Sequence, residues 1–422
     1  MLVMPWLNSL PLEVRLAVLT VLGLIAGAFA NYLIYSWAYF PRHISPWAPS
    51  DPKAPARKAT DRLPVLGWFG LRREHELHGG GFWVRPMLIE LGMALCLPAL
   101  YWFDTQTAGL LPSSLRHASA IAAFSDWGHT LFLVHSVIFT LMVAATFIDF
   151  DEQTIPDIIT LPGTLFALTV ATLPWRSWLP ADVYWGNQYG ITEATFNVPW
   201  PFDPVWLGRD GLWLALGIWS VWCFALTDRH LVLRHGLVRA FGYLCHGIRR
   251  NPSSRGLGVM WIVGVLAVFG IWIQSGDAFQ GLLTSLVGLA VGGGAVWAVR
   301  LVAGLAMGQE AMGFGDVTLM AMLGAALGWQ CAIVSCFFAP MLAICIVLIQ
   351  YMVTRQPAVP FGPYLCGGTV VTVLGWDLLW NRTFSQYVLL GEFVLWVLVG
   401  SLVAMGVMLA IWRQIKRMLF AM

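Results

Sequence analysis

The segment LFLVHSVIFTLMVAATFIDFDEQTIPD, residues 131–157, decides both the fold and the site of this chain. It starts with an apolar run of the kind that crosses a bilayer core of roughly 30 Å as a helix. It ends with four carboxylates, on Asp149, Asp151, Glu152 and Asp157, although only 11% of all residues are charged. The segment therefore predicts a membrane helix with an acidic cluster at its mouth.

The composition extends this prediction to the whole chain. Of 422 residues, 58% are hydrophobic and the mean hydropathy is +0.72, which is too apolar for an ordinary soluble domain. The apolar runs do not alternate as the strands of a membrane β-barrel do. The seven cysteines form no CxxC pair, so we expect neither disulfides nor a thiolate metal site. We expect the lipid bilayer as a partner and no nucleic acid.

The apolar runs predict an all-α, polytopic integral membrane protein with about eleven transmembrane helices. Two of these, 317–329 and 363–381, are candidates for short, tilted or re-entrant segments, because one is short and the other contains two glycines. The expected helices lie near 16–39, 86–104, 130–149, 157–174, 210–227, 257–275, 280–306, 317–329, 332–353, 363–381 and 388–412.

The basic residues predict the orientation of these helices. Lysine and arginine collect in segments 41–85 and 229–256 and in the tail, and short basic loops stay in the cytoplasm. The connection 175–209, which is rich in tryptophan and proline, then lies outside as an ordered cap. The same count places Asp149 and Gly313–Asp316 at the cytoplasmic edge of the inner membrane.

A second acidic motif gives the first one a chemical meaning. Asp316 follows Gly313 and Gly315 in the sequence GFGD and opens another apolar helix on the same side. Two neighbouring carboxyls do not both ionise easily, so one holds a proton while the other activates a water for peptide hydrolysis. Alone, acidic residues at a helix mouth only mark the interface, and Asp157 after Pro156 suits a helix start. A metal site is less favoured, because no histidine lies beside either motif.

Four motifs in order resemble those of the type IV prepilin peptidases. The first runs from Asp149 to Pro162, the second is QEAMGFGD at 309–316, and the third is VPFGPYL at 359–365. The fourth is the N-terminal set GAFAN at 27–31, LPVLGWFGLR at 63–72 and RPMLIE at 85–90.

The resemblance implies a membrane-embedded aspartic endopeptidase, a GxGD-type protease, that cuts the basic leader of prepilins or pseudopilins at the cytoplasmic face. Such enzymes serve type IV pili and type II secretion. Asp149 and Asp316 correspond to the catalytic pair, with Asp157, Pro156, Gly313 and Gly315 in supporting roles. No cofactor is implied for cleavage. S-adenosylmethionine is implied only if the family's second activity, N-methylation of the product, is retained.

Several positions depart from the family's pattern. The two CxxC pairs of its first loop are absent, and His43, His75 and His78 stand near their places without a clear fourth metal ligand. Thr318 replaces a usual lysine. Glu152 and Glu310 are candidates for attracting leader lysines, although acidic loop residues are more often only solvated.

Two other functions stay open: an inactive peptidase-like component of a pilus or secretion assembly, and a proton- or cation-coupled transporter.

The motifs divide the chain into four parts. The parts are 1–128 with the first helix, the degenerate loop 41–85 and the second helix; 129–174 with the first aspartate motif; 175–256, an insertion with an external Trp-rich segment, an extra helix and a basic stretch; and 257–422 with the GxGD motif and the C-terminal helices.

Overall fold

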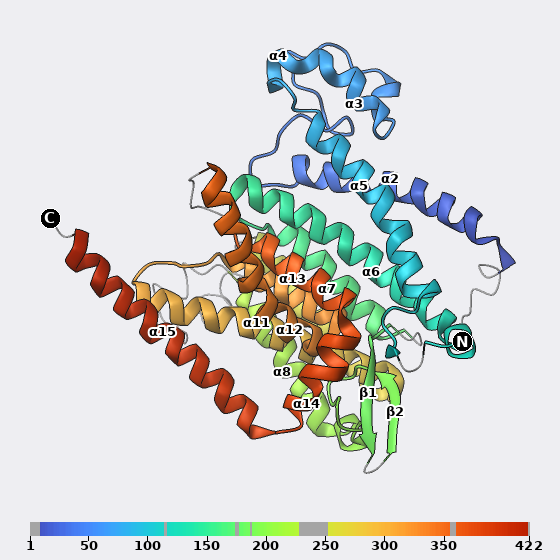
Figure 1. Ribbon diagram of the computed structural model, residues 1–422, viewed down its shortest axis with the longest axis vertical. Coiled ribbons are helices and arrows are strands. Elements are labelled where there is room, and N and C mark those ends of the chain that lie inside the picture. Colours follow the sequence, from blue (N-terminus) through green and yellow to red (C-terminus); the bar gives the residue numbers. More distant parts are fainter. Residues whose placement is uncertain are drawn as a thin grey trace.

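A computed structural model describes residues 9–113, 116–173, 177–185, 188–227, 252–354 and 360–420. The predicted basic stretch of the insertion lies mostly outside these residues. The described part is a helical bundle with a loop region at one end and a small hairpin at the other (Figure 1). The long helices are α2 (Leu12–Ser36), α5 (Val84–Tyr101), α6 (Ala118–Glu152), α7 (Asp157–Ala171), α8 (Arg209–Ala225), α10 (Pro252–Gln274), α11 (Asp277–Met307), α12 (Phe314–Thr354), α13 (Gly362–Leu374) and α15 (Glu392–Phe420).

The all-α polytopic fold is confirmed. Seven of the described helices, α2, α5, α6, α10, α11, α12 and α15, are long and apolar enough to cross a membrane. The estimate of about eleven was higher because α7, α8 and α13 are shorter and two predicted spans join as α12. α12 breaks at Gly328, whose φ of 88° no other residue adopts without strain, and α13 gives way to a π-helix at Asp377–Phe384. Both segments that were expected to be short, tilted or re-entrant therefore contain a departure from regular α-helix.

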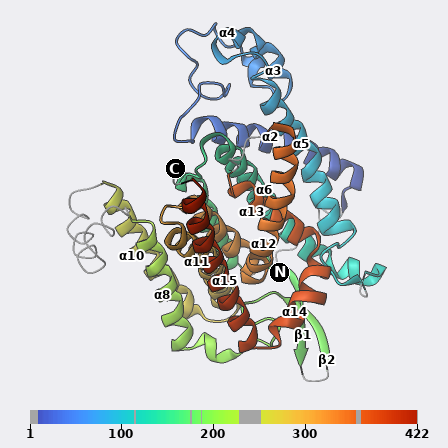
Figure 2. The same ribbon diagram turned by 60° about the vertical axis from the view of Figure 1, so that its left-hand side comes forward.

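The bundle has a central group and peripheral pairs. α11 and α12 pack closely, and α7, α13 and α6 surround them, while α2 pairs with α5. An added Cβ on Gly288 or Gly324 would overlap the other helix's backbone, so these glycines set the approach of α11 to α12. α8 and α10 lie side by side at the flank, and α15 contacts α11 (Figure 2).

The region between α2 and α5 is folded. It contains the short helices η1 (Ala59–Arg62), α3 (Leu66–Leu71), η2 (Arg72–Glu74) and α4 (His75–His78). The buried carboxylate of Glu90 accepts hydrogen bonds from Asn31 Nδ2, Val65 N and Trp68 Nε1. Because these donors come from two of the N-terminal motifs and Glu90 belongs to the third, Glu90 is the point at which the three motifs attach the loop to the helices.

The Trp-rich segment, which we expect to be external, contains two strands that the sequence did not predict. β1 (Pro180–Trp185) and β2 (Gln188–Glu193) pair antiparallel, with Pro180 opposite Glu193. Tryptophan Nε1 groups fasten the segment to the helices: Trp376 donates to Pro180 O at 2.6 Å, and Trp329 donates to Phe196 O at 2.9 Å. Indole rings thus bury their apolar bodies and satisfy strand and loop carbonyls.

Candidate active site

Asp149 lies in the last turn of α6 and is only 3% exposed. Its Oδ2 accepts a hydrogen bond of 3.0 Å from the backbone N–H of Gly362, at the start of α13. α6 ends at Gln153, which takes the left-handed conformation with φ of 54° and reverses the chain. Asp149 is therefore placed by a helix end and held by a distant motif.

Pro156 and Asp157 begin the next helix, as predicted. Pro156 occupies the N-cap position of α7, and Asp157 is its exposed first residue. A carboxylate in the first turn favours the partial positive charge of a helix N-terminus. Asp157 therefore stands at a helix start, as the sequence indicated.

Asp316 lies in the first turn of α12 and is 7% exposed. A Cβ on Gly313 would lie 3.8 Å from Asp316 Oδ2. A Cβ on Gly315 would lie only 2.7 Å from Ile155 O and 2.9 Å from Ile155 N. The second glycine of GFGD is therefore required, because the first aspartate motif packs directly on its backbone.

Ile155 joins the motifs. It is buried, and it contacts Gly315 as well as Gly362, where an added Cβ would lie 2.7 Å from Ile155 Cδ1. Asp149 and Asp316 consequently come within electrostatic range of each other. Three segments far apart in the sequence thus meet around one isoleucine, and they bring the two predicted carboxyls into one buried site.

The other carboxylates of the acidic cluster have protein partners. Asp151 forms a bidentate pair with Arg85, with N···O distances of 2.7 and 2.6 Å, and lies 3.5 Å from Arg42. Glu152 accepts hydrogen bonds from the backbone N–H groups of Tyr39 and Phe40. The expectation that Glu152 is solvated or attracts a basic leader was wrong: together with Asp151, it fastens the segment after α2 to the end of α6.

A cation does stand near the second motif, although Thr318 replaces the lysine. Thr318 Oγ1 donates to Gly315 O at 3.1 Å. Arg300, on α11, donates to Met312 O and Glu310, both at 2.9 Å, and lies within electrostatic range of Asp316. Arg300 therefore supplies the local positive charge and anchors the GFGD loop.

The three loop histidines do not assemble a metal site. The described residues contain no group of three or more side chains arranged to hold a metal ion. His43 and His75 each contact a backbone carbonyl, and His78 lies 3.3 Å from Glu74. The fully buried Glu74 carboxylate pairs with Arg57, which also donates to the carbonyls of residues 43, 45 and 48. A buried ion pair thus stands at the centre of this loop.

Sequence reasoning missed three residues of this site. Gly362 holds Asp149, Ile155 joins the motifs, and Arg300 faces the GFGD loop. The PFGPYL motif was a usable signal for Gly362, because a proline-flanked glycine opening an apolar helix leaves its N–H groups free. Arg300 was visible only as a lone charge within an apolar run.

Comparison with known proteins places these motifs in a family context. Residues 259–348, a range that contains Asp316 but not Asp149, match the type IV leader peptidase family. The prepilin leader peptidase/N-methyltransferase of Pseudomonas aeruginosa is 31% identical over 216 residues, which cover 48% of this chain and 63% of the relative. No solved structure matches the chain.

Two further relatives carry the same name. The protein of Dickeya chrysanthemi is 27% identical over 244 residues, covering 51% of this chain and 77% of the relative. That of Stutzerimonas stutzeri is 35% identical over 136 residues, covering 31% and 42%. The matches to the Stutzerimonas and Pseudomonas relatives therefore span less than two thirds of those proteins. Together with the apolar helices, the matches support a bacterial membrane protein.

Proposed function

We propose that this chain is a type IV prepilin peptidase, an aspartic endopeptidase that removes the basic leader of a prepilin or pseudopilin. The observation that carries this proposal is the meeting of Asp149 and Asp316 around Ile155. Both carboxyls are buried, and each belongs to a motif that the family resemblance connects with catalysis.

The two carboxyls share the work of hydrolysis. One accepts a proton from a water while that water attacks the scissile carbonyl carbon, and the other donates its proton toward the carbonyl oxygen. Collapse of the tetrahedral intermediate breaks the C–N bond, and the leaving amine takes up a proton from the pair. The N–H of Gly362 keeps Asp149 oriented during these transfers.

The basic residues around the site support a cytoplasmic location. Arg42 and Arg85 lie at the same end of α6 as Asp149, and both belong to the Lys- and Arg-rich segment 41–85, which ends at the start of α5. Short basic loops stay on the cytoplasmic side of a membrane. The leader is accordingly cut on that side.

For methylation the loop between α2 and α5 gives no support. It has no CxxC pair, and Arg57 and Glu74 form its buried centre. We therefore propose a peptidase that needs no cofactor, and S-adenosylmethionine becomes relevant only if methylation is found.

Cleavage of a prepilin or pseudopilin from the same genome tests the function. The purified protein should cleave the substrate, and Asp149→Asn and Asp316→Asn should each abolish cleavage, while the exposed control Glu76→Gln retains it. The mass of the product's N-terminus, measured with S-adenosylmethionine present, should show an unmodified amine. Cleavage by both asparagine variants would exclude the mechanism, and a wild type that cleaves no substrate would favour an assembly component or a transporter.

A further inference from the structure

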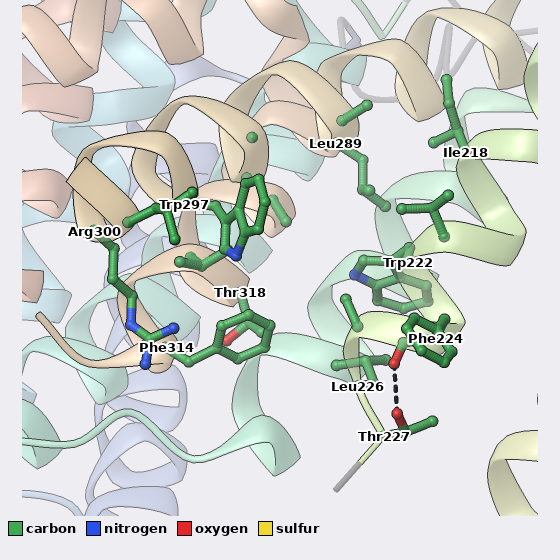
Figure 3. A pocket seen from close by; sticks show the side chains of 18 of the residues that line it. Ile218, Trp222, Phe224, Leu226, Thr227, Leu289, Trp297, Arg300, Phe314 and Thr318 are labelled. Atoms are coloured by element: carbon green, nitrogen blue, oxygen red, sulfur yellow. Dashed lines mark hydrogen bonds between the residues drawn. The ribbon is translucent and has the colours of Figure 1, made fainter. Parts of the chain in front are cut away.

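An apolar groove of about 970 Å³ runs along the flank of the bundle next to the second motif. Its walls are α8 on one side and α11 with the start of α12 on the other. Figure 3 shows Trp222 on α8 and Trp297 on α11 facing the space from opposite walls. α8 lies outside the residues that match the family.

We propose that this groove receives the apolar helix that follows the leader of the substrate, so that the insertion helix α8 forms part of the substrate site. This inference rests on the proposed function. The occupant is a transmembrane peptide helix with a cationic segment at the end that lies near Asp316.

The groove is wide enough to take about half of the cross-section of a helix. α8 and the two residues after it line the groove from Trp213 to Thr227, a length of about 21 Å at 1.5 Å per residue. The volume then gives a mean cross-section of about 46 Å², whereas a helix about 10 Å across occupies roughly 80 Å². A substrate helix would therefore lie half sunk, with its other face against lipid.

The floor of the groove leaves room for close approach. Gly217 on α8 and Gly294 on α11 both line it, and a Cβ built on either meets no atom within 4 Å. Small residues allow helix backbones to come close within a membrane, where dispersion contacts rather than the hydrophobic effect drive association. Trp213 and Trp297, one in each wall, are 69% and 49% exposed, so without an occupant the uncovered faces of their rings have only lipid to contact.

The end of the groove near Asp316 carries charged side chains, unlike the apolar walls. The Glu310 side chain is 80% exposed there, while its partner Arg300 is 17% exposed and is turned toward Met312 O. The charge offered to an incoming segment is therefore mainly the carboxylate. This suits a helix whose apolar part is preceded by lysines or arginines.

The groove and the dyad are separated by one turn of helix. Phe314, Val317 and Thr318 line the groove at helical spacing, and Asp316 lies on another face of the same turn. A chain passing around a helix about 10 Å across needs about three extended residues. A scissile bond just before the apolar helix is then within reach of Asp316 once the first residues of that helix unwind.

Filling the groove tests the proposal by kinetics. Gly294→Trp and Gly217→Trp should each raise KM for a full-length prepilin substrate about tenfold, with kcat near the wild-type value. Gly270→Trp, on the exposed face of α10 and outside the groove, is the matched control because a Cβ there also meets nothing within 4 Å. An unchanged KM in both groove variants, or an equal rise in the control, overturns the groove.

Cross-linking gives an answer that does not depend on turnover. A photo-reactive residue at position 294 or 217, in the Asp316→Asn background, should capture the substrate's apolar segment, whereas position 270 should not. Position 305, near the dyad end, should capture earlier residues of that segment than position 213 does. Capture of lipid only overturns the inference. If the wild type does not cleave, the proposed function is refuted instead. The cross-linking result then shows separately whether the groove binds an apolar helix.

Discussion

The backbone N–H of Gly362 donates to Oδ2 of Asp149 although 213 residues separate them. The bond forms because Ile155 fills the space beside Gly362 and because α13 starts there. A carboxylate that acts on water needs a fixed direction, and this bond supplies it for Asp149. The third motif therefore fixes the orientation of the catalytic carboxylate in the first motif.

Gly362→Ala should impair this arrangement. The added Cβ would lie 2.6 Å from Asp149 Oδ2 and 2.7 Å from Ile155 Cδ1, so one of them must move. Loss of a hydrogen bond to a charged group costs about 1.5–3 kcal/mol, which corresponds to a roughly 10- to 100-fold fall in kcat. The control is Gly367→Ala, where the nearest atom is a flexible Leu342 Cδ1 at 3.3 Å. Equal kcat values for the two variants would contradict the positioning role.

Asp149 and Asp316 should act as one unit. If the two carboxyls share a proton and a water, removing either removes the whole mechanism, and removing both costs little more. Single-turnover cleavage by Asp149→Asn, Asp316→Asn and the double variant measures this. We expect the three residual rates to agree within about threefold. A double variant slower than either single variant by the product of their effects would mean that the residues act independently.

Asp151 should differ from Asp149, despite lying only two residues away in the same cluster. Its bidentate pair with Arg85 is partly exposed, so we expect Asp151→Asn to lower the free energy of unfolding by about 1 kcal/mol. Cleavage should continue at near wild-type kcat. A double-mutant cycle with Arg85→Lys, which cannot restore a bidentate contact, measures the coupling in detergent. Complete loss of cleavage in Asp151→Asn at unchanged stability would assign Asp151 to the chemistry.

The helices could be predicted because their signal is local. Apolar runs gave the positions of α2, α5, α6 and α11 to within several residues, although α6 starts well before the expected residue 130. The expected boundary between the spans 317–329 and 332–353 lies beside the break at Gly328, although the two helices continue as α12. The hairpin at 180–193 was missed because its strands are short and its partners, such as Trp376, lie far along the chain.

The sequence predicted which residues form the site, but it did not predict the contacts that these residues make. Asp149, Asp316 and the two glycines were recognisable from motifs. The partners of Asp151 and Glu152 were not, because Arg85 and Tyr39 are 66 and 113 residues away. Long-range pairing decides which carboxylates stay available for chemistry, and the chain order of charges does not contain it.

Glu74 should hold the loop between α2 and α5 together. Its side chain is fully buried, and its loss would leave Arg57 largely buried, with only backbone carbonyls to bind. Removing one partner of a buried pair costs about 3–5 kcal/mol. Glu74→Gln should therefore increase proteolysis of residues 41–85, whereas the exposed Glu76→Gln should not. A chelator should leave the wild-type pattern unchanged, and destabilisation by the chelator would instead indicate a metal.

Acid should loosen the same loop through Asp61. Hydrogen bonds from Arg73, and one of 2.6 Å from Lys58 N, hold the pKa of the buried Asp61 carboxyl below its usual range. A lowered folded-state pKa stabilises the fold above the unfolded-state value near 3.9, and this stability is lost as the pH falls through the folded-state value. Hydrogen exchange of residues 59–73, corrected for the intrinsic rate, should therefore quicken below about pH 4. Asp61→Asn should exchange faster at neutral pH and lose this acid step, while Asp51→Asn should keep it. An acid step that survives in Asp61→Asn would assign the transition to another group.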